Sequence, residues 1–342
     1  MPSHTRISLA DPEAWASALQ GLPYAFAHTW NHCHAIHLTT GVSTFLYSFA
    51  AGDVRIVCPL AERTIADAVD IVTPYGFAGF VGNHSCEQFP DHWQHFVAEQ
   101  GYVCGYISLN PLFEQRSYYR PTEVFRHNEL FILDLTLSHD QLWRNLAKNR
   151  ARNLKQWNQS DATLIRDKDL LTEFFLAQYD DFFQSRNAAA VYRFTKATLA
   201  ALLNAPDTLL IGAGRAGHVE AVTLFGYTPH AADFLFNVSL PDGQQHSAGL
   251  LWYGFKELKA LGIPCVNLGG GIRENDGVAE FKRRFGGSQL PLTALKQIYR
   301  SERYAELCRR SGVDPKDRSG YFPAYRSPAS VSQGATSNEE QL

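Results

Sequence analysis

Several features that would place this protein in a familiar class are absent from its sequence. Its six cysteines form no Cys-x-x-Cys pair and have no regular spacing, so free thiols in a reducing compartment are expected, not a disulfide framework. No uncharged apolar run approaches the roughly 20 residues that cross a bilayer. The formal charge of −3 argues against a dedicated nucleic-acid binder, because such proteins carry a basic surplus.

The N-terminal residues show no signal peptide, because no apolar segment follows a charged start. We therefore expect a cytoplasmic protein that inserts into no membrane and binds no DNA. What the sequence does have is the composition of a globular protein, with 45% hydrophobic and 19% charged residues. Its 342 residues accommodate two ordinary domains.

The first part of the chain alternates short apolar runs with turn signals, which is typical of mixed α and β structure. Residues 45–49 and 54–60 predict a hairpin, since Gly52 lies in the turn between them. A break at residues 71–74 precedes a glycine- and aromatic-rich loop at residues 75–80. A helix over residues 91–100 and strands over residues 104–109 and 129–135 complete this part.

The second part opens with a helix-start signal, because Ser138 and Gln141 fit a capping box. The elements predicted from there are helices over residues 141–159, 170–183 and 196–204, strands over 208–213, 219–227 and 231–240, a helix over 247–261, a strand over 265–268, a helix over 278–284 and a strand over 292–298. A meander followed by a helix and a parallel crossover strand is the order of a GNAT acyltransferase domain. From residue 327 the polar, aperiodic tail predicts disorder.

The junction between the meander and its helix is where a GNAT domain binds its donor, because the helix N-terminus offers free amides to phosphates. GNAT enzymes carry a Gln/Arg-x-x-Gly-x-Gly/Ala loop there. Gln244, Ala248 and Gly249 occupy suitable positions, and Ser247 replaces the first glycine. These residues form either a loop for the pyrophosphate of acyl-CoA or a plain helix start with Ser247 as N-cap. The sequence leaves both interpretations open.

The strongest local pattern is the run of glycines at residues 269–271, directly after a predicted strand. Glycines there indicate a sharp bend or a close approach of the backbone to a ligand. Lys282 follows on a short predicted helix that faces this loop. A lysine so placed would stabilise the oxyanion formed when an amine attacks a thioester or ester carbonyl. The alternative is a solvated basic run, residues 282–284, beside a flexible turn.

Four segments carry a resemblance to a known family. They are residues 73–79 (Thr-Pro-Tyr-Gly-Phe-Ala-Gly), residues 108–112 (Ser-Leu-Asn-Pro-Leu), Asp134 and Leu135 with the Arg/Lys-rich stretch at residues 142–157, and residues 268–286 (Leu-Gly-Gly-Gly, then Phe-Lys-Arg-Arg-Phe-Gly). In this order they resemble motifs of the Fem-type peptidoglycan-bridge transferases and of related GNAT-superfamily proteins. The family often has Arg and His where Ser108 and Asn110 stand.

The resemblance implies an α/β (α+β) fold of two tandem GNAT-like domains with mixed, mostly antiparallel sheets, at residues 1–137 and 138–300. A helical extension at residues 301–326 and a disordered tail at residues 327–342 would follow. The implied reaction moves an acyl group from acyl-CoA (acetyl-CoA, for example), or an aminoacyl group from charged tRNA, onto an amine. The acceptor is expected to be an amino sugar, a cell-wall precursor or a biosynthetic amino acid. No metal is expected.

The resemblance also assigns roles to single residues. Lys282 would assist the acyl-transfer transition state, and Phe281 would line the channel beside it. Tyr75 and Gly270 are further candidates for contact with the substrate. Arg186, Tyr192 and Arg193 are candidates for the acceptor site; without the resemblance they form an ordinary exposed loop.

Two departures from the family support a second hypothesis. The usual GNAT catalytic tyrosine is absent, because Phe281 and Phe285 stand in that helix, and Ser247 alters the donor loop. The alternative function is therefore a non-catalytic binding module that keeps a degenerate double GNAT fold.

Arg150 lies in the middle of an apolar arc of the helix predicted over residues 141–159. A guanidinium in such an arc needs an anionic or carbonyl partner, since an unpaired buried charge is costly. The partner is either Asp180 or Asp181 in a structural salt bridge, or a phosphate or carboxylate of the substrate.

Histidines cluster early in the chain, with His28 and His32 four residues apart on an expected helix and His34 and His37 close behind. That spacing is compatible with zinc. No carboxylate or cysteine pair completes a site, and with 13 histidines in the chain a chance cluster is the preferred interpretation.

Overall fold

A computed structural model describes residues 2–113, 115–271 and 276–327, so the expected disordered tail lies outside the described residues from position 328 on. Contacts divide the chain into two units. Unit 1 comprises Met1–His127, Ala189–Val191 and Leu292–Leu342, and unit 2 comprises Asn128–Ala188 and Tyr192–Pro291. Whether residues 1–137 and 138–300 fold as autonomous domains stays a prediction.

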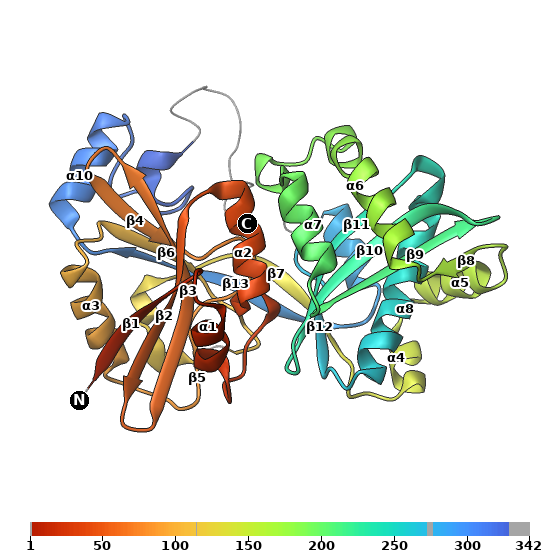
Figure 1. The fold of residues 1–342 in the computed structure, drawn as a ribbon, viewed down its shortest axis with the longest axis horizontal. Coiled ribbons are helices and arrows are strands. Elements are labelled where there is room, and N and C mark those ends of the chain that lie inside the picture. The colour runs from red at the N-terminus through yellow and green to blue at the C-terminus, as the bar shows by residue number, and fades with distance from the viewer. Residues whose placement is uncertain (1, 114, 272–275, 328–342) are drawn as a thin grey trace. The chain divides into compact units, whose positions relative to one another are not determined.

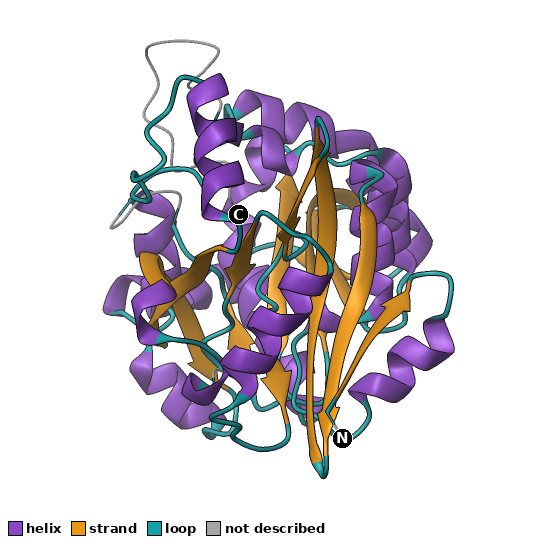
Figure 2. Cartoon of the chain, turned by 90° about the vertical axis from the view of Figure 1, so that its left-hand side faces the viewer, coloured by secondary structure: helices purple, strands orange, loops and turns teal. Residues whose placement is uncertain are grey.

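In unit 1 the strands follow the order β1-β2-β3-β4-β6-β13 (Figure 1), with helices packed beside the strands (Figure 2). The strands are β1 (Ser3–Ser8), β2 (Ser43–Ala51), β3 (Val54–Ile65), β4 (Ala68–Val72), β6 (Cys104–Ser108) and β13 (Ser288–Ile298), with β5 (Val81–Gly82) paired to β3. Its helices are α1 (Pro12–Leu19), α2 (Trp30–Thr40), α3 (Phe89–Glu99) and α10 (Ser301–Arg310). Among the described strands of unit 1, β4 and β6 run parallel and the other neighbours are antiparallel.

The core of unit 1 is aromatic. Tyr47 on β2 packs against Phe80, Trp93 and Phe96, with ring centroids 4.7–6.4 Å apart. All four side chains are buried. Such edge and tilted contacts bury large apolar areas and fix α3 on the face of the sheet.

In unit 2 the strands follow the order β7-β12-β11-β10-β9-β8. The strands are β7 (Val124–Asp134), β8 (Thr163–Ile165), β9 (Thr208–Arg215), β10 (His218–Tyr227), β11 (Ala232–Ser239) and β12 (Cys265–Asn267). The helices are α4 (His139–Asn145), α5 (Lys148–Asn158), α6 (Lys168–Ser185), α7 (Lys196–Asn204), α8 (Ser247–Ala260) and α9 (Gly277–Arg283). Here β11 and β12 form the parallel pair (Figure 1).

The two units repeat one plan. In unit 1, antiparallel β3 and β4 are followed by α3 and then by β6, which runs parallel to β4. In unit 2, antiparallel β10 and β11 are followed by α8 and then by β12, which runs parallel to β11. An antiparallel strand then lies beyond each parallel pair: β13, which belongs to unit 1 from Leu292 on, and β7, which belongs to unit 2 from Asn128 on. This is the element order expected for two GNAT-like domains.

The prediction of one helix over residues 141–159 is wrong. The capping box of Ser138 and Gln141 is present, but Leu146 and Ala147 have extended backbones with ψ of 140° and 142°, so α4 ends and α5 begins there. The amide of Ala147 donates to the carbonyl of Arg284 at 3.1 Å. A contact with a residue far along the chain therefore interrupts a sequence whose local pattern favours a continuous helix.

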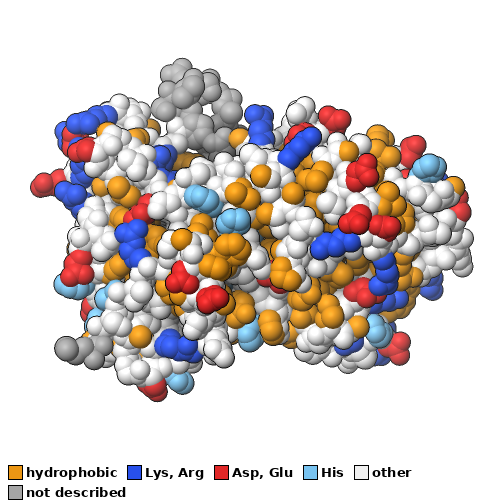
Figure 3. Space-filling view, in the orientation of Figure 1, with side chains coloured by type: hydrophobic (Ala, Val, Ile, Leu, Met, Phe, Trp, Pro, Cys, Tyr) orange, Lys and Arg blue, Asp and Glu red, His pale blue; other side chains and the backbone are white. Residues whose placement is uncertain are grey.

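Among the described residues no helix combines the length and the apolar character needed to cross a membrane. On the face shown in Figure 3, basic and acidic side chains are interspersed, in keeping with the small formal charge.

A buried carboxylate fastens the C-terminal segment to unit 1. Asp70 on β4 is fully buried and accepts from Arg63 at 2.7 Å, from Arg326 at 2.7 Å and from the hydroxyl of Tyr325 at 3.0 Å. Because Arg326 and Tyr325 come after α10, one carboxylate joins β3, β4 and the end of the described chain.

We expect Asp70→Asn to lower the free energy of unfolding by about 3 kcal/mol, because two guanidinium groups lose the charge that they share in the interior. Urea denaturation followed by circular dichroism measures this. The matched control is Asp67→Asn, which removes an exposed carboxylate paired with Arg303 and should cost less than about 1 kcal/mol. Equal effects of the two substitutions would contradict the structural role of Asp70.

Candidate functional site

The glycine run after β12 forms a tight bend. Gly269 has φ of +74°, and its amide donates to the side-chain oxygen of Asn267 at 2.8 Å. The amide of Asn267's side chain donates in turn to Asp233 on β11 at 3.0 Å. A Cβ on Gly270 would lie 2.6 Å from the carbonyl oxygen of Glu129 on β7. The bend inferred from the glycines is thus present, and the close approach is to the neighbouring strand.

Lys282 reaches this bend from α9. The helix begins with Asp276 as N-cap, whose carboxylate accepts from the amide of Ala279 at 2.7 Å. One turn later the Nζ atom of Lys282 donates to the carbonyl of Gly270 at 2.6 Å. The lysine is only 9% exposed. The structure therefore brings together two of the residues singled out from the sequence, Lys282 and Gly270, and rules out a solvated position for this lysine.

The ammonium group lies where two parallel strands part. β11 and β12 are paired only at Ala232 with Val266 and at Asp233 with Asn267. Beyond these pairs β11 continues to Ser239, whereas the chain after β12 turns at the glycine bend. The Nζ atom of Lys282 is 5.9 Å from the ring centroid of Phe234, the next residue of β11. In sheets with parallel strands, ligands bind at the carboxyl ends of those strands.

Burial changes the acid–base behaviour of this lysine. Removal of the ammonium from water lowers the pKa of Lys282 to about 8, and the carboxylate of Asp276 partly opposes the shift. Near neutral pH the group is a cation with a hydrogen to donate, and it is able to lose a proton slightly above that range. Such a poised amine is a common feature of catalytic sites.

Arg150 on α5 holds the helix that carries the lysine. Its Nη2 donates to the carbonyl of Phe281 at 2.9 Å, and its guanidinium carbon lies 4.3 and 4.4 Å from the ring centroids of Phe281 and Phe285. Arg150 is 4% exposed, and burial together with the nearby Arg284 lowers its pKa to about 10. The expected salt bridge with Asp180 or Asp181 is wrong: within the described residues this guanidinium meets a backbone carbonyl and two aromatic rings.

The segment predicted to bind the donor is already helical. A 3-10 helix, Pro241–His246, runs directly into α8, and the amide of Ser247 donates to the carbonyl of Gln244. The interpretation of Ser247 as N-cap is therefore wrong, because His246 before it has helical dihedral angles. The hydroxyl of Ser247 faces Asn237 at 3.3 Å. Gln244 is exposed and Ala248 half-buried.

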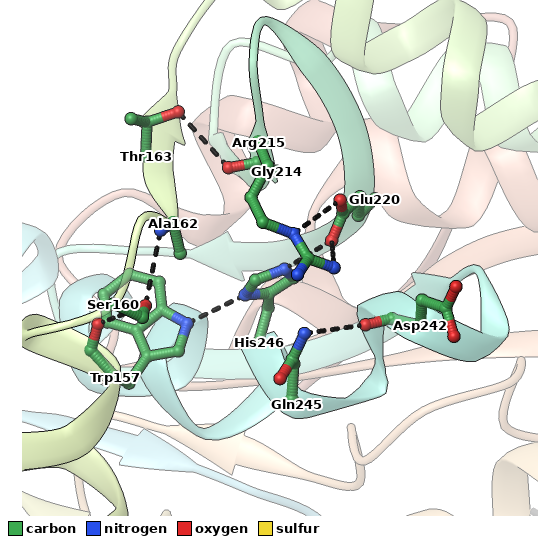
Figure 4. A network of polar contacts seen from close by, with 10 residues as sticks. All are labelled: Trp157, Ser160, Ala162, Thr163, Gly214, Arg215, Glu220, Asp242, Gln245 and His246. Atoms are coloured by element: carbon green, nitrogen blue, oxygen red, sulfur yellow. Dashed lines mark hydrogen bonds and ion pairs between the residues drawn. The ribbon is translucent and has the colours of Figure 1, made fainter.

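A chain of polar contacts locks this junction (Figure 4). The indole of Trp157 donates to Nδ1 of His246 at 2.9 Å, and Nε2 of His246 meets Glu220 at 2.8 Å. Because an indole nitrogen can only donate, Nδ1 of His246 is the acceptor and Nε2 carries the hydrogen. Arg215 makes two bonds of 3.0 Å to Glu220 and holds the pKa of that carboxyl below its usual range, with His246 adding to the effect.

The same tryptophan leaves no room at the start of α8. A Cβ on Gly249 would lie 2.5 Å from the ring of Trp157. Gly249, at the second glycine position of the donor motif, therefore allows α5 and α8 to pack closely. The sequence did not predict this packing contact, because Trp157 and Gly249 lie on helices far apart in the chain.

The acceptor-site candidates are not part of the group around Lys282. Arg186 is exposed and stacks on the ring of Phe182 at 4.4 Å. The ring of Tyr192 stacks on Phe183 at 5.6 Å, and Arg193 is exposed. All three lie on the segment between α6 and α7. Tyr75, the remaining candidate, belongs to unit 1.

Two histidines of the early cluster, His28 and His32, contact backbone carbonyls of unit 1. His28 lies in a 3-10 helix and His32 in α2, so they do not share one helix. Burial lowers the pKa of both to about 4, and each ring faces a backbone carbonyl. In the part of the chain that the structure describes, no group of three or more His, Cys, Asp or Glu side chains is arranged to hold a metal ion.

We expect Gly270→Ala to destabilise the protein by about 1–3 kcal/mol and to displace the lysine, because the added methyl group collides with the carbonyl of Glu129. Thermal unfolding measures the change. Gly277→Ala is the matched control at the first residue of α9, where nothing lies within 4 Å of the added Cβ; it should be neutral or slightly stabilising. A neutral Gly270→Ala would contradict the close approach at the bend.

Comparisons with known proteins bear on the fold. No protein-family model matches the sequence, and no curated protein sequence is significantly similar to it. Among solved structures, FemX matches with a TM-score of 0.69 and 10% identity over 89% of this chain and 99% of FemX. A conserved protein of unknown function from Bacteroides thetaiotaomicron matches with a TM-score of 0.59 and 11% identity, over 87% and 100% of the two chains.

L-PGS from Bacillus licheniformis matches with a TM-score of 0.55 and 15% identity, over 84% of this chain and 92% of that one. At such low identities these likenesses speak for the fold alone. The expected α/β class and the resemblance to Fem-type proteins are confirmed at the level of the fold, which is similar to that of FemX.

Proposed function

We propose that this protein is an N-acyltransferase. It transfers an acyl group from acyl-CoA, or an aminoacyl group from charged tRNA, to an amine of an amino sugar, a cell-wall precursor or a biosynthetic amino acid. Unit 2 holds the reaction site, at the carboxyl ends of β11 and β12. The observation that carries this proposal is the buried ammonium of Lys282 at the bend of Gly270.

The chemistry is direct attack of the amine on the activated carbonyl. As the carbonyl oxygen gains charge, the ammonium of Lys282 donates a hydrogen bond to it in surroundings from which water is largely excluded, where such a bond is worth most. The thiolate or ribose oxygen leaves, and a base or water takes the proton of the amine. A covalent acyl-enzyme is not needed: burial raises the pKa of Cys265, the thiol on β12, to about 11, so it stays protonated.

The remaining residues have supporting roles in this proposal. Arg150 fixes α9 through the carbonyl of Phe281, whose ring lies beside the lysine's helix. Arg186, Tyr192 and Arg193 remain candidates for contact with the acceptor, Tyr75 for contact with the substrate, and Gln244 and Ser247–Gly249 for contact with the donor. The protein is proposed to act in the cytoplasm.

A second candidate function rests on a specific observation. The amide of Ser247 is engaged by Gln244, and Trp157 packs on Gly249, so the loop that holds a pyrophosphate in GNAT enzymes is closed in unit 2. A non-catalytic module with a degenerate double GNAT fold is compatible with that closure.

We expect the purified protein to consume an acyl-CoA or a charged tRNA in the presence of an amine acceptor, and Lys282→Met to lower kcat by about 100-fold, because one oxyanion donor is lost. Thiol release or loss of the aminoacyl ester, measured over a panel of amines, reports turnover. Lys259→Met is the matched control: this lysine in the last turn of α8 also donates to a backbone carbonyl, that of Leu135 at 2.7 Å.

Normal folding of Lys282→Met, checked by circular dichroism, is part of the test. Full activity of this variant would remove the lysine from the mechanism. Absence of turnover together with absence of calorimetric binding of acetyl-CoA, coenzyme A and charged tRNA would favour the binding module.

The pH profile tests the charge state. A lysine with pKa of about 8 that acts as a cation predicts a flat kcat/KM below that value and a fall of about tenfold per pH unit above it. If the neutral amine acted as a base instead, the rate would rise through the same range. In Lys282→Arg the charge persists to high pH, so the alkaline limb should vanish in whatever activity remains.

A further inference from the structure

His246, directly before α8, is held from two sides (Figure 4). Its side chain is buried, with 1% of the residue exposed. The indole of Trp157 on α5 donates to its Nδ1 atom at 2.9 Å, and its Nε2 atom meets Glu220 on β10 at 2.8 Å. Because an indole nitrogen can only donate and a carboxylate can only accept, the arrangement fits one form of the ring, the neutral form with hydrogen on Nε2.

A second proton on this ring has one place to go, the Nδ1 atom. Both nitrogens of an imidazolium are donors, so the N–H groups of His246 and Trp157 would face each other with no acceptor between them. The bond to Glu220 would persist and become stronger, because both of its partners are then charged. Protonation of His246 therefore breaks the contact with α5 and keeps the contact with β10.

The charged groups around the ring permit that proton. Glu220 faces it from β10, and Arg215 on β9 shares the carboxylate through two bonds of 3.0 Å. Arg215 and, to a smaller extent, His246 hold the pKa of Glu220 below its usual range, so this carboxylate stays an anion where imidazoles gain protons. Farther out, the carboxylates of Asp161 and Asp242 act on Arg215, and α5 presents a neutral indole to the ring.

Trp157 is placed to move when its bond breaks. It is the last residue but one of α5 and is half-buried, whereas His246 is buried. Its ring lies where a Cβ on Gly249 would be 2.5 Å away, and its centroid is 5.5 Å from that of Tyr253 on α8. An outward rotation of the indole therefore separates the two facing donors without a shift of β10 or α8.

We propose that Trp157 and His246 form a pH-sensitive latch between α5 and α8, closed while the imidazole is neutral and open once it is protonated. When the latch opens, the indole leaves its position over Gly249. Near the other end of α5, the bond of Arg150 to the carbonyl of Phe281 persists, because a guanidinium stays charged in this pH range. The inference concerns packing within unit 2 and does not depend on acyl transfer.

Nuclear magnetic resonance of the full chain with 15N-labelled tryptophan tests the latch between about pH 8 and pH 5.5, where imidazoles gain protons. We expect the indole N–H signal of Trp157, assigned by its loss in Trp157→Phe, to shift as the pH falls, because its acceptor disappears. The indole of Trp15, which donates to the carbonyl of His28 at 2.8 Å, is the internal reference. Its signal should stay in place, because a carbonyl does not titrate.

His246→Gln fixes the latch in its closed form. The amide oxygen of glutamine can accept from Trp157 while its nitrogen donates to Glu220, and neither group titrates. We expect the pH-dependent shift of Trp157 to disappear in this variant. His139→Gln is the matched control at an exposed position of α4 in the same unit, and it should behave as the unaltered protein does.

Two results would overturn the proposal. One is a Trp157 signal that stays fixed over this pH range in the unaltered protein, and the other is an equal shift of that signal in His246→Gln. The first result needs no histidine variant, so the test remains decisive if His246→Gln fails to fold.

Discussion

The hydrogen bond from Lys282 to the carbonyl of Gly270 is the constraint around which unit 2 is arranged. A buried ammonium is costly unless its surroundings fix an acceptor for it. Here the acceptor is presented by a glycine bend that Asn267 holds in shape, and the donor by α9, which Arg150 holds through Phe281. Helix, bend and strand therefore support one another, and none of them places the ammonium alone.

The two units repeat one plan but differ at the equivalent junction. In unit 2 the segment after β11 enters a 3-10 helix, which uses the amide of Ser247, and Trp157 closes on Gly249. In unit 1 the segment after β4 stays irregular, and the carbonyl of Phe77 in it accepts from the side-chain amide of Asn110 at 2.7 Å.

Local patterns in the sequence predicted most strands and helices of unit 2, as well as the glycine bend with a lysine beside it, because periodicity, capping residues and glycine act over a few residues. They missed β4, which was interpreted as a break, and the interruption between α4 and α5. These local patterns also did not predict that Arg150 bonds to the carbonyl of Phe281. Each miss depends on a residue distant in the chain: β4 is completed by β6, and Ala147 bonds to Arg284.

Stability alone does not account for the charges buried in unit 2. Arg150 is enclosed by two phenylalanine rings and bonds to one carbonyl, so an apolar side chain of similar volume would fill its place at lower cost. The same comparison applies to Lys282, whose ammonium group lies 5.9 Å from the centroid of the apolar ring of Phe234. Buried groups that make a core less stable than an apolar alternative are expected at functional sites. Both departures converge on α9, one at the backbone of Phe281 and the other at the next residue.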